Sequence, residues 1–174
     1  MSVPFLEECL PVLARTPATL DTLLRDLPEV WITATEGPET WSPYAVMGHL
    51  VHAEKTDWMP RLKIILEHGI NRPFDVFDRE AQFQTVDRPS LPALLDEFCR
   101  LRHDNLAQLR EMNLRSEHLE LVGMHPELGR VTARQLLGTW TAHDLAHILQ
   151  VSRVMAKRYK QDVGPWAQYL SVMK

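Results

Sequence analysis

Apolar residues recur every three or four positions along most of the 174-residue chain, and this spacing predicts helices joined by proline-containing loops. The first helical stretch covers residues 4–27, where the sequence RTPATL interrupts the apolar pattern. Thr16 can cap a helix whose first position is Pro17, since the amide that proline lacks has no helical partner there. We therefore expect either two helices or one kinked helix in this stretch.

The second and third helices have well-marked beginnings. Ser42 can cap a helix that carries Pro43 in its first turn. Pro60 falls inside the apolar run that follows, so we expect a kink or a break near Met59. The third helix follows a cap at Ser90. Its apolar positions at helical spacing are Leu91, Leu94, Leu95, Phe98, Leu101, Leu106 and Leu109.

A fourth helix follows the segment 113–130, and a loop of this length usually carries function or short helices of its own. Thr132 and Gln135 can form a capping box at the start of this helix, which we expect to reach about Tyr159. We expect the tail, residues 164–174, to pack a last turn or two against the other helices. No stretch alternates apolar and polar residues cleanly enough to predict a strand.

Four main helices without strands predict an all-α fold, a four-helix bundle, within a single domain of residues 1–174. A chain of this length can bury one substantial core without help from disulfides or metals. Cys9 and Cys99 form no CxxC motif, and we interpret both as buried thiols in a reducing compartment.

Composition and charge exclude several classes of partner. The formal net charge is −4, whereas nucleic-acid-binding domains are usually basic, so we expect no nucleic-acid partner. No apolar run approaches the roughly 20 residues of a membrane span, so we expect no membrane partner either. The N-terminal residues include acids and prolines where a signal peptide needs a basic end and an unbroken apolar run. These features predict a cytoplasmic protein.

The strongest candidate chemistry is a pair of histidines in the fourth helix. His143 and His147 are four positions apart, which places them on one face of the helix, one turn from each other. Two imidazoles so placed can hold a divalent metal, as in the HExxH motif. The chain has 8 histidines, however, so that such a pair also arises by chance, and a buried histidine with a hydrogen-bond partner is the ordinary alternative.

A third imidazole is available in the second helix, where His49 lies in the largely apolar sequence GHLVHAE. Facing helices of a bundle bring such side chains together in the interior. Three neutral imidazoles with open positions for water are typical of a catalytic metal site rather than of a closed structural one. His52 lies one turn further along and could replace His49, and spacing alone does not separate the two.

Three polar residues near these histidines have less specific roles. The HExxH motif needs glutamate directly after its first histidine, and Asp144 takes that place here. Asp144 could orient an imidazole, but we favour a solvated helix charge. Glu54 lies about 140° round the helix from His49, which favours a salt-bridge partner over a ligand. Gln150, three positions after His147, could line the same pocket.

The chain resembles the DinB family, the DinB/YfiT-like metalloenzymes, from about Trp41 onward. The matching segments are WSPYAVMGHLVHAE, HPELGRVTARQLLGTWTAHDLAHILQVSRVMAKRY and VGPWAQYL. The resemblance implies a four-helix bundle of DinB/YfiT-like type, often a homodimer, with a divalent metal held by three histidines. By motif, the single histidine of the second helix is His49, and the pair in the fourth helix is His143 and His147.

The resemblance also implies a choice of activities, because a metal-dependent hydrolase and bacillithiol- or mycothiol-dependent transferases share this fold. A metal on three neutral nitrogens stays positively charged and lowers the pKa of a bound water or thiol. We therefore expect a metal-dependent enzyme with a small-molecule substrate, either a hydrolase or a low-molecular-weight-thiol transferase. Zinc or nickel is the expected metal, with iron or copper as alternatives. The rival hypothesis is a non-enzymatic, stress-related bundle that binds a small molecule or a partner.

Overall fold

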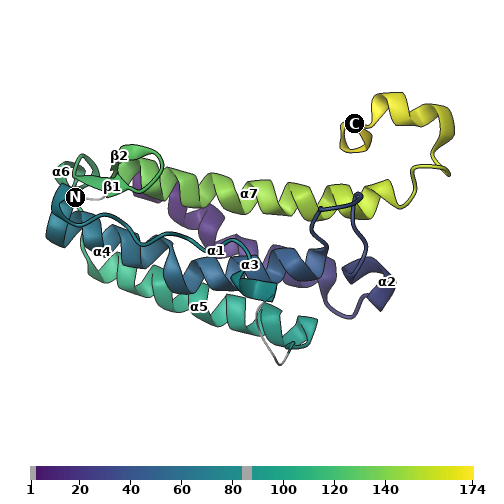
Figure 1. The fold of residues 1–174 in the computed structure, drawn as a ribbon, viewed down its shortest axis with the longest axis horizontal. Helices are drawn as coiled ribbons and strands as arrows, with labels where there is room; N and C mark the ends of the chain where they lie inside the picture. The colour runs from purple at the N-terminus through teal and green to yellow at the C-terminus, as the bar shows by residue number, and fades with distance from the viewer. Residues whose placement is uncertain (1–2, 84–87) are drawn as a thin grey trace.

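Four long helical segments run along the longest axis of the molecule in the computed structural model, which describes residues 3–83 and 88–174 (Figure 1). They are α1 (Pro4–Leu24), α3 (Pro43–Thr56) continued by α4 (Trp58–His68), α5 (Leu91–Glu111) and α7 (Ala133–Lys157). Helices α1 and α3 each pack against both α5 and α7, and the apolar faces of all of them form the core. The expected all-α, four-helix bundle is therefore confirmed.

Helix α1 is continuous, so one helix and not two covers the first stretch. Pro17 lies inside it and cannot donate a hydrogen bond to the carbonyl of Leu13, four residues earlier. That carbonyl instead accepts from Nη1 of Arg102 on α5, at 2.8 Å. Thr16 does not begin a helix, because its hydroxyl donates to the carbonyl of Val12 within α1.

The second helix is broken as expected, although the break is at Asp57, two residues before Met59. Ser42 caps α3 as predicted. Asp57 separates the two helices, and α4 begins at Trp58, so that Pro60 falls in its first turn. Proline is tolerated there because the first amides of a helix have no helical acceptor.

The other predicted helix starts are also confirmed. Ser90 caps α5, with its hydroxyl accepting from the Ala93 amide. At the start of α7, the Thr132 hydroxyl accepts from the Gln135 amide and the Gln135 side chain accepts from the Thr132 amide, which completes the capping box. Helix α7 ends at Lys157, slightly before the expected end.

The expectation that the chain has no strand is wrong. Strands β1 (Val122–His125) and β2 (Gly129–Thr132) form an antiparallel hairpin with Val122 opposite Thr132. Helix α6 (Ser116–Leu119) precedes the hairpin, so the long loop contains short elements of its own, as predicted. Strands of four residues are too short for alternation of apolar and polar positions to stand out in the sequence.

Gly123 allows β1 to pack directly on α4 and on the segment that follows it. A Cβ atom at this position would lie 2.7 Å from Cγ1 of Ile65 and 2.8 Å from Cε1 of Phe74, two buried side chains. We expect Gly123→Ala to lower the free energy of unfolding by about 1–3 kcal/mol through overpacking, as measured by urea denaturation. Gly138→Ala in α7 is the control, because its nearest neighbour would be at 3.6 Å and alanine favours the helix. A similar loss in both variants would contradict this reasoning.

The remaining elements are short, and most lie at the ends of the bundle, whereas η2 (Ala81–Phe83) packs against α3 (Figure 1). The tail folds back so that η4 contacts α7, but Trp166 and Tyr169 stay 70% and 79% exposed, so the expected packing is only partial.

Both cysteines are free; Cys9 is buried as expected, whereas Cys99 is exposed, contrary to expectation. The short helices are α2 (Glu29–Ile32), η1 (Gly69–Asn71), η2 (Ala81–Phe83), η3 (Gly164–Tyr169) and η4 (Ser171–Met173). Within residues 3–83 and 88–174, no helix has both the length and the apolar character to span a bilayer.

Candidate metal centre

Three histidines from two facing helices meet inside the bundle. Nε2 of His143 lies 3.0 Å from Nε2 of His49 and 3.1 Å from Nε2 of His147. His143 and His147 point together because they are one turn apart on α7, and His49 reaches them from α3. The structure thus brings together the three side chains that the sequence predicts as ligands.

The two shortest spacings of the three ring nitrogens fit a shared cation, and all three nitrogens lie within 4.8 Å of one another. Nitrogen ligands that bind one metal at about 2.1 Å lie roughly 3.0–3.4 Å apart, depending on whether the geometry is octahedral or tetrahedral. Hydrogen bonding alone explains the arrangement less well, because Nε2 of His143 carries either one proton or one lone pair and so makes a well-directed hydrogen bond with only one of its two neighbours. The remaining close pair of nitrogens would then have no well-directed hydrogen bond between them.

Burial keeps these imidazoles in the neutral form that a metal requires. Removal from water, together with a smaller effect of the nearby His147, lowers the pKa of His49 and of His143 to about 3. Burial also lowers the pKa of His147, although its hydrogen bond to Gln150 acts in the opposite direction. All three lone pairs are therefore available at neutral pH.

Gln150 orients His147, because its Oε1 lies 2.8 Å from Nδ1 of the ring. When Nδ1 carries the proton and donates it to this oxygen, Nε2 is left as a lone pair directed at the other two histidines. The sequence suggests only that Gln150 could line the pocket. Gln150 is three positions after His147 on α7, and residues at this spacing are close enough for their side chains to form a hydrogen bond.

We expect Gln150→Leu to weaken metal affinity about 10–100-fold, since partners of metal-binding histidines usually contribute that much. Competition with a chromogenic chelator measures the affinity. Gln108→Leu is the matched control, because Gln108 contacts Lys63 on the outside of the bundle. Unchanged affinity in Gln150→Leu would mean that packing alone holds the ring.

Aromatic rings surround the histidine cluster. Trp41 is stacked parallel to His147 with ring centroids 6.4 Å apart, and it lies 4.9 Å from His49. Trp58 meets His143 edge-on at 5.0 Å, and Phe77 meets His49 edge-on at 5.4 Å. These rings exclude water from much of the cluster, and this accounts for the loss of hydration that lowers the histidine pKa values.

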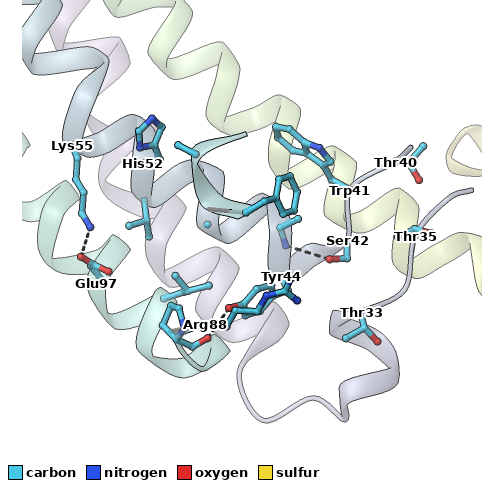
Figure 2. A pocket seen from close by; sticks show the side chains of 17 residues that line it. Thr33, Thr35, Thr40, Trp41, Ser42, Tyr44, His52, Lys55, Arg88 and Glu97 are labelled. Carbon is cyan, nitrogen blue, oxygen red and sulfur yellow. Dashed lines mark hydrogen bonds and ion pairs between the residues drawn. The ribbon is translucent and has the colours of Figure 1, made fainter. Parts of the chain in front are cut away.

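His52 does not belong to this cluster, so the alternative in which it replaces His49 is not supported. It lines a separate cavity of about 480 Å³, together with Tyr44, Lys55 and Thr40 (Figure 2). Trp41 lines both this cavity and the one that contains the three histidines. The turn between His49 and His52 is therefore enough to direct the two rings into different cavities.

A buried charge cluster lies beside the histidines, and the expectation of a solvated Asp144 is wrong. Asp144 has no exposed surface, and its two oxygens accept from Nη1 and Nη2 of Arg102 at 2.5 and 2.9 Å. The salt-bridge role predicted for Glu54 is confirmed, since its Oε1 lies 2.8 Å from Nη2 of the same guanidinium. Glu54 also accepts from Nε1 of Trp140 at 3.0 Å and from Nδ2 of Asn105 at 2.9 Å.

The spacing of apolar residues in the sequence places Arg102 on the buried face of α5, although arginine is usually exposed. Arg102 is four residues after Phe98 and four before Leu106, both of which are buried, so it lies on the core face of α5. Asp144 is likewise four residues after the buried Trp140. Two opposite charges on core faces of different helices are expected to pair, since an unpaired buried charge is costly.

Comparisons with known proteins show which family and which fold share these features. A family model described as the DinB superfamily matches residues 13–151. YfiT from Bacillus subtilis, described as "a probable metal-dependent hydrolase with an unusual four-helix bundle topology", superposes with a TM-score of 0.77 at 19% identity. The superposition covers 91% of this chain and 90% of that chain. No curated protein matches the chain.

Proposed function

Since this chain belongs to the DinB superfamily, we propose that it is a metal-dependent hydrolase with a divalent metal on His49, His143 and His147. The observation that carries this proposal is the convergence of three neutral ring nitrogens from two helices. The likeness to YfiT supports it, because that protein is described as "a probable metal-dependent hydrolase". Zinc or nickel suits three imidazoles, and iron or copper is the alternative.

When bound, the metal supplies a Lewis acid that lowers the pKa of water towards neutrality. The residues of the chain determine how well it does so. The three ligands are neutral, so they leave the positive charge of the ion undiminished. Gln150 fixes the ring of His147, and the aromatic side chains of Trp41 and Trp58 keep bulk water away from the reacting groups.

A low-molecular-weight thiol is the second candidate for activation. The same set of uncharged ligands lowers the pKa of a thiol as well as that of water. The ligands and the cavity are compatible with both reactions, and an activity measurement distinguishes a hydrolase from a thiol transferase.

Elemental analysis of the natively expressed chain tests the metal. We expect about one divalent ion per chain, and background levels in a His143→Ala/His147→Ala variant. His52→Ala is the control that keeps the metal, because His52 lines the other cavity. Equal, substoichiometric metal in all three proteins would refute the proposal.

The activity is then tested with the metal restored, on a panel of esters and amides and on a panel of thiol-transfer substrates. Hydrolysis that requires the three histidines supports the leading proposal, and thiol transfer with the same requirement supports the second candidate. Metal binding without turnover in either panel would favour the non-enzymatic bundle.

We also propose a cytoplasmic homodimer. Leu145 and Leu149 are each 52% exposed and lie one turn apart on α7, which makes this helix face a suitable subunit contact. The two free cysteines suit a reducing compartment. Sedimentation velocity measures the oligomeric state, and a single species at the mass of the monomer would contradict the dimer.

A further inference from the structure

The cavity that contains the three histidines extends well beyond them. It has a volume of about 410 Å³, and its lining on α7 runs from Gln135 to His147. Twelve helical positions correspond to about 18 Å. On the facing helices the lining runs from His49 to Arg61. The cavity is therefore elongated, with the histidines at one end and Arg61 near the other.

Arg61 is a buried cation with an unused donor. It is 8% exposed, and its Nε lies 2.5 Å from Oδ1 of Asp57. Nη2 donates to the carbonyl of Asp75 at 3.4 Å, and the guanidinium lies over the ring of Phe74. Nη1 makes no hydrogen bond with any residue that the structure describes. A guanidinium nitrogen without an acceptor at the wall of a cavity is suited to a ligand oxygen.

His125 presents a second donor to the same cavity. The amides of Glu127 and Leu128 both donate to its Nδ1, each at 3.1 Å, so the ring proton must be on Nε2. Burial lowers the pKa of His125, and the nearby charge of Arg61 lowers it further, so the ring stays neutral. His125 also lines the cavity, where its Nε2–H has no acceptor among the described residues.

With a divalent cation on the three histidines, the charges in the cavity favour an anion. Arg61 and Arg79 are positive, and Asp57 and Glu127 are negative, so the described side chains balance each other. A divalent cation on the histidines adds two positive charges to this balance. A ligand with a negative charge is then attracted, and a ligand with a positive charge is repelled.

We propose that the cavity binds an elongated organic acid, with its reactive group at the three histidines and its carboxylate between Arg61 and His125. Two donors match the two oxygens of a carboxylate, whereas a phosphate would have a third oxygen without a donor from these two residues. The lining also includes the apolar side chains of Phe74, Val131 and Leu136, which suit a hydrocarbon chain. The position of the reactive group and the attraction by a metal charge rest on the proposed function, but the two hydrogen-bond donors of Arg61 and His125 do not.

Binding of hexanoate, hexan-1-ol, hexylamine and hexyl phosphate to the chain, measured by calorimetry after dialysis against a chelator, tests this inference. Removing metal prevents the carboxylate from binding a cation at the histidines instead. We expect hexanoate to bind at least about tenfold more tightly than hexan-1-ol, and hexylamine no more tightly than the alcohol. Equal affinity for acid and alcohol would overturn the inference, and tighter binding of hexyl phosphate would overturn the choice of carboxylate.

Two variants identify the residues responsible. Arg61→Gln combined with Asp57→Asn removes the cation without leaving a lone buried carboxylate, and it should abolish the preference for hexanoate over hexan-1-ol. Arg79→Gln changes an exposed side chain that the fold does not need, and it should weaken hexanoate about threefold at low salt. Lys63→Gln is the control, because this exposed cation of α4 does not line the cavity. Unchanged hexanoate affinity in both cavity variants would overturn the assignment.

Metal content measured on the same proteins separates this inference from the proposed function. Loss of the acid preference with normal metal content supports the role of Arg61 independently of the metal. A wild-type chain that binds hexanoate but holds no metal would refute the proposed function and leave the acid site standing.

Discussion

Arg102→Met is expected to lower the free energy of unfolding by about 3–5 kcal/mol, the usual cost of removing one member of a buried ion pair. Arg102 is 1% exposed and binds both Glu54 and Asp144, which would be left as two carboxylates in the core. It also donates to the Leu13 carbonyl, which Pro17 leaves without its helical donor. Urea denaturation followed by circular dichroism measures the change.

Two further variants determine whether charge or shape explains the loss. A Glu54→Gln/Arg102→Met/Asp144→Asn triple variant leaves no uncompensated charge and should recover at least half of the lost stability. Arg100→Met removes an exposed arginine of α5 that pairs with Asp104 at 3.2 Å, and it should change stability by less than about 0.5 kcal/mol. A triple variant as unstable as Arg102→Met would show that packing, and not charge, dominates.

Lowering the pH from 6.5 towards 3 is expected to destabilise the metal-free chain steeply. The unfolded histidines take up protons near pH 6.5, whereas His49 and His143 in the folded chain have pKa values of about 3. The unfolded state therefore binds more protons in this interval, so stability falls as the pH falls. Each shift corresponds to roughly 4–5 kcal/mol when fully developed.

Asp57 acts in the opposite direction, because burial raises its pKa to about 6 and protonation below that value favours the folded chain. Its shift is smaller than either histidine shift, and two histidines oppose one carboxyl, so the net effect is destabilising. Urea midpoints at pH 7.5, 6 and 5 in the presence of a chelator measure the slope. His143→Ala/His147→Ala should flatten it, and a wild-type stability independent of pH would contradict the prediction.

The sequence is sufficient to predict features that depend on neighbours within one or two turns. The caps at Ser42, Ser90 and Thr132 are local hydrogen bonds, and all three are as predicted. His143 and His147 share a face because of helix geometry alone. The assignment of His49 to their cluster needed the further assumption that the apolar faces of α3 and α7 meet in a bundle.

Features that depend on distant segments were harder to predict. The residues near Asp144 in the sequence are compatible with either an exposed or a buried position, and its burial is tolerable because Arg102 on another helix pairs with it. The hairpin packs closely on Ile65 and Phe74 at Gly123. These residues are distant in the sequence, so a local sequence pattern does not predict the packing. The separation of His49 from His52 likewise depends on what packs around α3.

The missing amide of Pro17 has a consequence for any attempt to stabilise this protein. Substituting a better helix former at position 17 would give the Leu13 carbonyl a second donor, and this amide would share the oxygen with the guanidinium of Arg102. The carbonyl that Pro17 leaves free in α1 thus accepts the hydrogen bond by which α5 is attached to it. A regular helix at this point of α1 would weaken the hydrogen bond that holds Arg102, and with it Glu54 and Asp144, next to the three imidazoles.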